Sequence, residues 1–412
     1  MSEIYVVGVG MTPFGRLTEV SLKAMVRQAT EAALDDAGLQ KDSIEAAFFG
    51  NASQGHMEGQ QMIRGQIALR DMGISRIPVV NVENACASGS SAFTLAVNHL
   101  KAGAGDIALA VGAEKMYSAD RSRMFSVFDS ALDISCAADV HADLLRMGEG
   151  VEVPPGTTSP KPYSVFMDVY AAFARAHMKR FGTTQRQIAA VAAKNHAHSV
   201  HNPLSQYRTA YTIDEVLAAA PITYPLTVPM CSPVSDGAAA AILCTGAALR
   251  RLGLDTHRAV RVLSSVIQTG SDRNYTDVRN HLTVHAARRA YEAAGVGPRD
   301  VSVAEVHDAT AMGEIIQIEN LGFFEFGEGG PASERGDTSI GGRIPVNPSG
   351  GLESKGHPVG ATGIAQMHEL VTQLRGEAGP RQVDGASIAV AENGGGLYGA
   401  EEAVACVTIL GR

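Results

Sequence analysis

Residues 81–116 read NVENACASGSSAFTLAVNHLKAGAGDIALAVGAEKM, and this stretch guides the interpretation of the whole chain. An apolar run beginning at Ile77 leads into it, and a helical segment from Phe93 to Lys101 follows. Cys86 therefore lies at a predicted strand-to-helix junction, where free N–H groups and the helix dipole favour a thiolate. The pattern predicts a nucleophilic cysteine with a lowered pKa. The alternative is that Cys86 is a small, buried hydrophobic residue.

The composition narrows the class of protein. The chain has 412 residues, of which 45% are apolar and 19% charged, enough for a large interior and two or three domains. Its net charge of −9 is spread without a basic block, which argues against nucleic-acid binding. Without a signal-peptide pattern or a run of about 18 apolar residues, we expect no membrane span and a soluble, cytoplasmic protein. The five cysteines have no CxxC spacing, so neither a zinc site nor a disulfide framework is predicted.

Two parts of the chain resemble each other. Residues 36–52 align without a gap to residues 293–309, and residues 106–114 align to residues 387–395. The similarity predicts an internal duplication of a strand–helix unit, and chance similarity between helix ends rich in Ala and Gly is the alternative. Alternating strands and helices predict an α/β fold with a mixed or parallel sheet in each half.

The duplicated halves flank a region without a counterpart. The predicted organisation is a first part of the N-terminal half at 1–116, an inserted loop domain at 117–230, the end of the N-terminal half at 231–250 and a C-terminal half at 251–412. The inserted region has two predicted helices, at 169–181 and 186–201, and we expect it to form a lid or ligand-binding flap. His196, His198 and His201 lack a carboxylate or cysteine partner at a matching spacing, so the sequence favours a solvated helix face over a metal site.

Three further motifs carry groups suited to catalysis. His307-Asp308 follows a predicted strand, His357 lies on a glycine-rich turn before a predicted helix at 364–374, and residues 392–396 read ENGGG after a buried strand. A histidine held by Gly and Pro can orient a thiol and accept its proton. A run of glycines lets backbone N–H groups approach a carbonyl oxygen as an oxyanion hole. The structural alternatives are a hydrogen-bonded loop histidine and a tight bend.

Together these motifs resemble those of the thiolase superfamily, specifically the sterol-carrier-protein-2-type thiolases and their bacterial thiolase-like relatives. The resemblance spans the chain and rests on Asn84-Ala-Cys-Ala-Ser-Gly, His307-Asp308, Gly356-His-Pro-Val-Gly-Ala-Thr-Gly and Ser235-Asp-Gly-Ala. It implies two duplicated α/β halves in a five-layered αβαβα arrangement, with an inserted loop domain, and a homodimer. It also implies a coenzyme A thioester as substrate, no cofactor or metal, and a place in lipid and fatty acid metabolism.

The resemblance also implies roles for individual residues. Carried over by position, Cys86 is the acyl-accepting nucleophile and His357 is its activating partner. His307 replaces the Asn that helps to form the first oxyanion hole. The N–H groups of Cys86 and Gly394 form the second oxyanion hole.

The resemblance also implies two substrate contacts and reveals one difference from the thiolase pattern. Ser232 falls where these enzymes touch the pantetheine arm, and Met167 falls in the acyl pocket. The two positions at which thiolases carry a second, acid/base cysteine hold Glu392 and Ala309 here. We expect Glu392 to stand in for that cysteine, with its side chain facing the cavity of Cys86 and its pKa raised by burial. The alternative is a structural Glu392 paired with Lys or Arg.

The leading interpretation is a thiolase-like acyl-CoA acyltransferase that forms or cleaves a carbon–carbon bond through an acyl-Cys86 intermediate. One alternative is a non-catalytic or weakly catalytic acyl-CoA or lipid-binding protein. Another is a thiolase-like aldolase or condensing enzyme that works with a small zinc-ribbon/OB-fold partner. Intact Cys86 and His357 argue against pure binding, and the missing second thiol argues against a standard thiolase.

Overall fold

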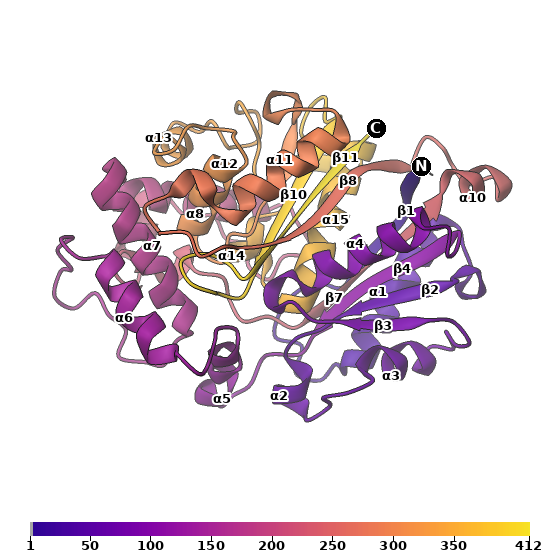
Figure 1. Cartoon of the computed structure of the whole chain (residues 1–412), viewed down its shortest axis with the longest axis horizontal. Coiled ribbons are helices and arrows are strands. Elements are labelled where there is room, and N and C mark those ends of the chain that lie inside the picture. The colour runs from indigo at the N-terminus through magenta and orange to yellow at the C-terminus, as the bar shows by residue number, and fades with distance from the viewer. Residues whose placement is uncertain (1–2) are drawn as a thin grey trace.

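The computed structural model describes residues 3–412, so the first two residues of the predicted N-terminal half lie outside the described residues. Strands and helices alternate along the chain (Figure 1). The strands are β1 (Ile4–Met11), β2 (Ala46–Gly50), β3 (Val79–Val82), β4 (Ile107–Glu114), β5 (Pro221–Thr223), β6 (Leu226–Thr227), β7 (Gly237–Thr245), β8 (Val260–Thr269), β9 (Val303–Glu305), β10 (Ile388–Gly395) and β11 (Val404–Gly411). The helices are α1 (Leu22–Ala37), α2 (Gln54–Glu58), α3 (Arg64–Asp71), α4 (Ser88–Lys101), α5 (Arg121–Ser126), α6 (Ala137–Met147), α7 (Val165–Phe181), α8 (Gln185–Ser199), α9 (Ile213–Ala218), α10 (Gly246–Arg251), α11 (Leu282–Ala294), α12 (Ala311–Asn320), α13 (Gly329–Glu334), α14 (Gly351–Lys355) and α15 (Val359–Arg375).

Helix α1 shows how local sequence sets an element's ends. The side chain of Ser21 accepts a hydrogen bond from the backbone N–H of Ala24 and caps the helix. Gly38 ends it in the left-handed region, with φ 65°, where glycine carries no steric cost. Residues next to the helix in the sequence therefore set both of its ends.

The strands of both halves join in one sheet of nine strands, in the order β3-β2-β4-β7-β1-β8-β11-β10-β9. Strands β1 and β8 connect the halves through the antiparallel pairs Tyr5↔Arg261 and Val6↔Val260. Outward from this junction β1, β7, β4 and β2 mirror β8, β11, β10 and β9, as a duplication requires. Each half is mixed, with parallel pairing at β2 and β9 and antiparallel pairing elsewhere. The sheet predicted for each half is present, and the β1–β8 pair joins the two edge to edge into one continuous sheet.

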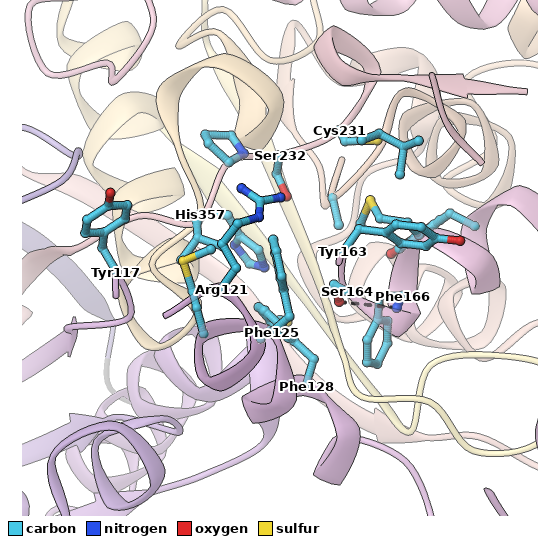
Figure 2. Close-up of a pocket in the computed structure, with 18 of the residues that line it drawn as sticks. Tyr117, Arg121, Phe125, Phe128, Tyr163, Ser164, Phe166, Cys231, Ser232 and His357 are labelled. Carbon is cyan, nitrogen blue, oxygen red and sulfur yellow. Dashed lines mark hydrogen bonds between the residues drawn. The ribbon is translucent and has the colours of Figure 1, made fainter. Parts of the chain in front are cut away.

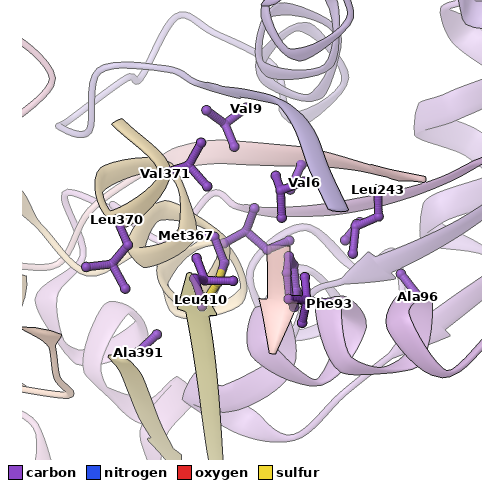
Figure 3. Close-up of a cluster of buried hydrophobic side chains, with 14 of the residues drawn as sticks. Val6, Val9, Phe93, Ala96, Leu243, Met367, Leu370, Val371, Ala391 and Leu410 are labelled. Atoms are coloured by element: carbon purple, nitrogen blue, oxygen red, sulfur yellow. The ribbon is translucent and has the colours of Figure 1, made fainter. Parts of the chain in front are cut away.

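Two helices lie between the halves. Helices α4 and α15 pack against each other and against strands of both halves. In their shared core, Phe93 of α4 and Met367 of α15 lie among strand residues such as Leu243 and Leu410 (Figure 3). Helices α1 and α3 cover the outer face of the first half, and α11 covers that of the second. The order of layers is thus αβαβα, which confirms the predicted fold class.

The segment between β4 and β7 carries α5 to α9 and the small β5–β6 hairpin. Strand β7 then returns to pair with β1 and β4. Helices α7, α8 and α12 enclose a small core of their own, so this segment packs against the C-terminal half. The domain boundaries themselves stay a prediction. Across residues 3–412, no helix is both long and apolar enough to cross a bilayer.

The expectation of a solvated histidine face on α8 is wrong for two of the three residues. His196 and His198 are buried, and only His201 is exposed. His196 Nε2 lies 3.1 Å from the carbonyl oxygen of Pro229, and His198 Nδ1 lies 3.0 Å from that of Asn347. These histidines join α8 to its neighbours, because α8 is covered on several sides by α9, α12, α13 and α14.

Candidate active site

Cys86 lies in a short 3₁₀ turn, residues Ala85–Ala87, between β3 and α4. The residue before it, Ala85, is left-handed, with φ 47°, and its N–H donates to Glu83 Oε1 at 2.6 Å. A non-glycine residue in this region is strained, and such strain is typical of functional turns. Glycine is needed opposite the turn, because a Cβ on Gly395 would lie 2.2 Å from the carbonyl oxygen of Asn84.

Two cavities meet at Cys86. The first, of about 450 Å³, is called the catalytic cavity below, and the second has about 760 Å³. The catalytic cavity collects most of the residues singled out from the sequence: Cys86, Met167, Ser232, His307, His357 and Gly394. Figure 2 shows His357 and Ser232 on one side of it, with Phe125, Phe128 and Phe166 around its apolar part.

Three of these residues form a close group. One ligand atom from each of Cys86, His307 and His357 lies within 4.8 Å of the other two. The two imidazole rings are nearly perpendicular, with centroids 5.2 Å apart. His307 follows β9 and His357 lies between α14 and α15, so the fold joins three segments far apart in the sequence.

The hydrogen bonds of His357 leave one nitrogen available as a base. Its Nδ1 lies 2.7 Å from the hydroxyl of Thr362, which itself donates to the carbonyl oxygen of Pro358 at 3.1 Å. Since the hydroxyl hydrogen is used, Nδ1 carries the ring hydrogen and Nε2 is the acceptor. Nε2 is buried and finds no hydrogen-bond partner among residues 3–412. The backbone is held as well, because the N–H of His357 donates to Ser235 Oγ at 3.0 Å.

His307 is the opposite tautomer, with its ring hydrogen on Nε2. Ser90 Oγ donates to Asn393 Oδ1 at 2.8 Å, so the amide of Asn393 turns its Nδ2 toward His307 Nδ1, also at 2.8 Å. His307 Nδ1 therefore accepts, and its Nε2 carries the hydrogen. The site thus combines a thiol, an imidazole acceptor and an imidazole N–H donor.

The electrostatics contradict the predicted pKa of Cys86. Burial and the charges of Glu114 and Glu83 raise the pKa of Cys86 to about 12, while the backbone N–H groups of Cys86 and Gly396 lower it by less. Burial also lowers the pKa of His307 to about 4 and that of His357 well below its usual range. The helix-terminus argument gave the wrong direction because desolvation outweighs the N–H groups. The cysteine is a neutral thiol beside two neutral imidazoles.

Glu392 does not face the cavity as expected. It is fully buried but lines neither cavity, and its Oε2 accepts the backbone N–H of His307 at 3.0 Å. The expected rise of its pKa does occur, caused by burial first and then by the charges of Glu402 and Asp308. Strand β10 runs parallel to β9, with Ala391 paired to Glu305. Glu392 therefore lies beside the end of β9, where its side chain contacts the backbone of His307. No Lys or Arg pairs with it among the described residues.

The remaining predicted residues lie in the cavity wall. Met167 comes from α7, and the N–H of Ser232 donates to the carbonyl oxygen of Ala309 at 3.0 Å. Gly394 lines the cavity, but within the glycine run it is the N–H of Gly396, together with that of Cys86 itself, that lowers the pKa of the Cys86 thiol. The role of Gly394 in an oxyanion hole stays a prediction.

Several site residues were missed from the sequence. Thr362 and Asn393 lie inside motifs that were recognised, so their hydroxyl and amide were the available signals. Glu402, which lines the catalytic cavity, follows the glycine run within a loop and carried no signal of its own. Asp308 holds the His307 segment to α14 by accepting the N–H of Leu352 at 2.8 Å.

Cys86, His307 and His357 have the composition of a zinc site. However, a zinc-ligating histidine normally donates its second ring N–H to an acceptor. His307 instead accepts a hydrogen bond at Nδ1 and carries its hydrogen on Nε2, the nitrogen that would have to bind the metal. The group therefore fits proton transfer better than metal binding.

Comparisons with known proteins match this site and fold. Residues 4–213 match the family model "Thiolase, N-terminal domain" and residues 265–412 match "Thiolase C-terminal domain-like". The chain is 40% identical over 400 residues to acetyl-CoA acetyltransferase of Methanothermobacter thermautotrophicus, covering 97% of this chain and 98% of that protein. It is 37% identical over 402 residues to human sterol carrier protein 2, covering 95% and 70%, respectively.

Two further comparisons agree. Benzoylsuccinyl-CoA thiolase subunit BbsB of Thauera aromatica is 30% identical over 388 residues, covering 93% of this chain and 91% of that one. The structure of the Ltp2-ChsH2(DUF35) aldolase has the same fold, with a TM-score of 0.78, 21% identity, and coverage of 99% and 97%. The chain therefore belongs to the thiolase family.

Proposed function

We propose that the protein is a thiolase-type acyltransferase that accepts an acyl group from a coenzyme A thioester on Cys86. The observation that supports this best is the grouping of the Cys86 thiol with an imidazole acceptor and an imidazole donor within 4.8 Å. A neutral thiol beside a neutral imidazole needs no charge separation at rest in a buried site. A pure binding protein needs no such group.

The proposed acylation uses the three residues in turn. As the Cys86 sulfur attacks the thioester carbonyl, its S–H bond breaks and the proton passes to His357 Nε2. The His307 Nε2–H stabilises the oxyanion of the tetrahedral intermediate. The bond from the carbonyl carbon to the coenzyme A sulfur then breaks, and the leaving thiolate takes the proton from His357. The acyl group stays on Cys86 and is passed to a carbon acceptor, or the same steps run in reverse.

Incubation with acetyl-, octanoyl- and benzoyl-CoA, followed by intact mass measurement, tests this proposal. An adduct of the acyl mass is expected, located on the Cys86 peptide and absent in Cys86→Ala. Cys231→Ala is the matched control, because Cys231 lines the same cavity and the variant should still be acylated. Absence of any adduct, or an adduct that survives Cys86→Ala, would contradict the proposal.

The cavity supports a thioester with an extended, apolar acyl group, as used in lipid metabolism. Aromatic and aliphatic side chains such as Phe125, Phe166 and Met167 surround its inner part. Arg16 and Arg121 are exposed at the same cavity, in a protein of net charge −9, and suit the phosphates of coenzyme A.

We also propose a homodimer. Strand β3 is an edge strand of the large sheet, with Val80 43% exposed, and Met62 and Ile63 nearby are 75% and 59% exposed. Unpaired edges with exposed apolar residues favour association. Light scattering should give about twice the chain mass of 43.1 kDa. A monomer at micromolar concentration would contradict this.

An aldolase or condensing activity is the second candidate function. The absence of a thiol at Ala309 and Glu392, the two positions of the second thiolase cysteine, favours it over a standard thiolase. The structural neighbour named as a DUF35 aldolase assembly makes a small zinc-ribbon/OB-fold partner part of this candidate. Release of an aldehyde or ketone from a 3-hydroxyacyl-CoA, with no acyl adduct on Cys86, would favour this candidate over acyl transfer.

A further inference from the structure

A second carboxylate lines the cavities of the catalytic cysteine, from the loop between β10 and β11. Glu402 lines both the catalytic cavity and the second cavity, and so does Cys86. The Glu402 side chain packs closely on Gly394, where a Cβ would lie 2.8 Å from Glu402 Cγ. Gly394 therefore leaves the space in which this carboxylate approaches the site.

Two side chains, Gln317 and His281, contact the carboxylate of Glu402. Gln317 Nε2 donates to Oε1 at 2.9 Å, and His281 Nε2 lies 3.3 Å from Oε2. Because His281 Nδ1 accepts the N–H of Thr283 at 3.1 Å, its hydrogen is on Nε2 and faces the carboxylate. Oε2 is buried, and this long contact with His281 is the one polar contact found for it within residues 3–412. Such an oxygen is available to a group in the cavity.

The charge of Glu402 affects the pKa values of neighbouring residues. Burial raises the pKa of Glu402, but His281, its own backbone N–H and His307 outweigh burial and bring the pKa to about 2. Glu402 is therefore an anion at neutral pH, and its charge favours the protonated forms of His307 and Tyr170. Glu392, by contrast, is held protonated by its surroundings and lines neither cavity.

We propose that Glu402 is the acid/base residue that moves the proton at the substrate α-carbon, in the role of the cysteine missing at Ala309 and Glu392. The inference rests on the acyl transfer proposed above and carries over to the aldolase candidate, because both reactions pass through an enolate at that carbon. It is supported by the position of Glu402, a buried residue that lines the cavity formed also by Cys86, His307 and His357.

The proposed step is balanced without another reactant. The Glu402 carboxylate takes a proton from the α-carbon, so a C–H bond breaks, an O–H bond forms and the electron pair makes an enolate. The enolate oxygen is held by the His307 Nε2–H. The enolate carbon attacks the acyl carbonyl on Cys86, a C–C bond forms and the C–S bond to Cys86 breaks. The departing thiolate takes back the proton held by Glu402.

Exchange of α-hydrogens for deuterium measures this step alone. Acetyl-, propionyl- and octanoyl-CoA are incubated with the full chain in D₂O, and deuterium uptake is followed by mass spectrometry. We expect Glu402→Gln to lower the exchange rate at least about 100-fold, while acylation of Cys86 changes less than about threefold. Glu402→Asp should retain part of the exchange. Asp133→Asn, which removes another carboxylate of the second cavity, should exchange as the wild type does.

The outcomes separate this inference from the proposed function. If Cys86 is acylated but Glu402→Gln exchanges at the wild-type rate, or the wild type does not exchange any of the three probes, the role of Glu402 is overturned and acyl transfer stands. If no probe acylates Cys86, the proposed function fails. Should Glu402→Gln not fold, Gln317→Leu carries the test: a several-fold loss of exchange in the folded variant is expected, and unchanged exchange overturns the inference.

Discussion

At the scale of single residues, the site is built from neutral groups with opposite hydrogen-bonding roles. Thr362 directs the hydrogen of His357 to Nδ1, and Asn393 directs that of His307 to Nε2. Burial keeps both imidazoles neutral and the Cys86 thiol protonated. The nucleophile is thus activated only when His357 accepts its proton during attack.

The raised pKa of Cys86 predicts a simple pH dependence of alkylation. The rate with iodoacetamide should rise about tenfold per pH unit from pH 6 to 9 without levelling, because only the thiolate reacts. Peptide mapping of the Cys86 adduct at each pH measures it. A small thiol such as glutathione, with an ordinary pKa, serves as the control and should begin to level within the same range. Levelling of Cys86 alkylation below pH 8 would show that the thiolate is stabilised instead.

Glu392 should behave as a neutral hydrogen-bond acceptor. Glu392→Gln keeps an oxygen for the His307 N–H, so we expect turnover within about twofold of the wild type and little change in stability. Glu392→Leu removes the acceptor and leaves that N–H unsatisfied, which should cost about 1 to 3 kcal/mol of unfolding free energy. Denaturant unfolding and steady-state turnover measure the two effects. Loss of turnover in a stable Glu392→Gln would instead support a catalytic role.

At the scale of elements, the site depends on close approach between strands and central helices. His357 precedes α15, whose first turn lies on β4, and Gly112 of β4 allows this contact. A Cβ on residue 112 would lie 2.0 Å from the carbonyl oxygen of Gly360. Because the opposing atoms are backbone atoms, they cannot move aside as a flexible side chain would.

Gly112→Ala should therefore destabilise the protein and disturb the site together. We expect a loss of about 1 to 3 kcal/mol or more, as for overpacked cores, and slower acylation of Cys86 because α15 and His357 shift. Gly15→Ala is the matched control, since a Cβ there has no neighbour within 4 Å and should leave stability nearly unchanged. Equal stability of the two variants would show that α15 can move away from β4 without cost.

At the scale of the whole molecule, buried histidines and buried carboxyl groups set the pH dependence of stability. The pKa of His198 falls to about 3 and that of His307 to about 4, from 6.5. Below pH 6.5 the unfolded chain binds more protons at these histidines, so their stabilising contribution is lost as the pH falls toward 4 for His307 and toward 3 for His198. Conversely, burial raises the pKa of Glu114 to about 7 from 4.5, and also raises those of Asp308 and Glu392. Their contribution is lost as the pH rises above 4.5.

Between pH 4.5 and 6.5 the buried histidines favour folding more as the pH rises, whereas the buried carboxyls favour it less. The free energy of unfolding should therefore be greatest in that window. Thermal unfolding midpoints from pH 3 to 9 at constant ionic strength measure this. Glu114→Gln should reduce the loss of stability on the alkaline side, because its buried carboxyl no longer has to ionise. A midpoint that rises steadily to pH 8 would contradict the prediction.

The sequence by itself determined the duplicated α/β fold, the ends of α1 and the motifs that carry Cys86, His307 and His357. These features rest on local capping, on hydrophobic periodicity and on motifs contiguous in the chain. The tertiary structure alone decided the protonation of the site, because desolvation depends on what surrounds a group and not on its neighbours in sequence. For this reason the sign of the Cys86 pKa shift and the burial of His196 and His198 were wrongly predicted. Tertiary structure also decided that Glu402, and not Glu392, lines the cavity, because the return of the chain from β10 to β11 brings Glu402 beside Gly394.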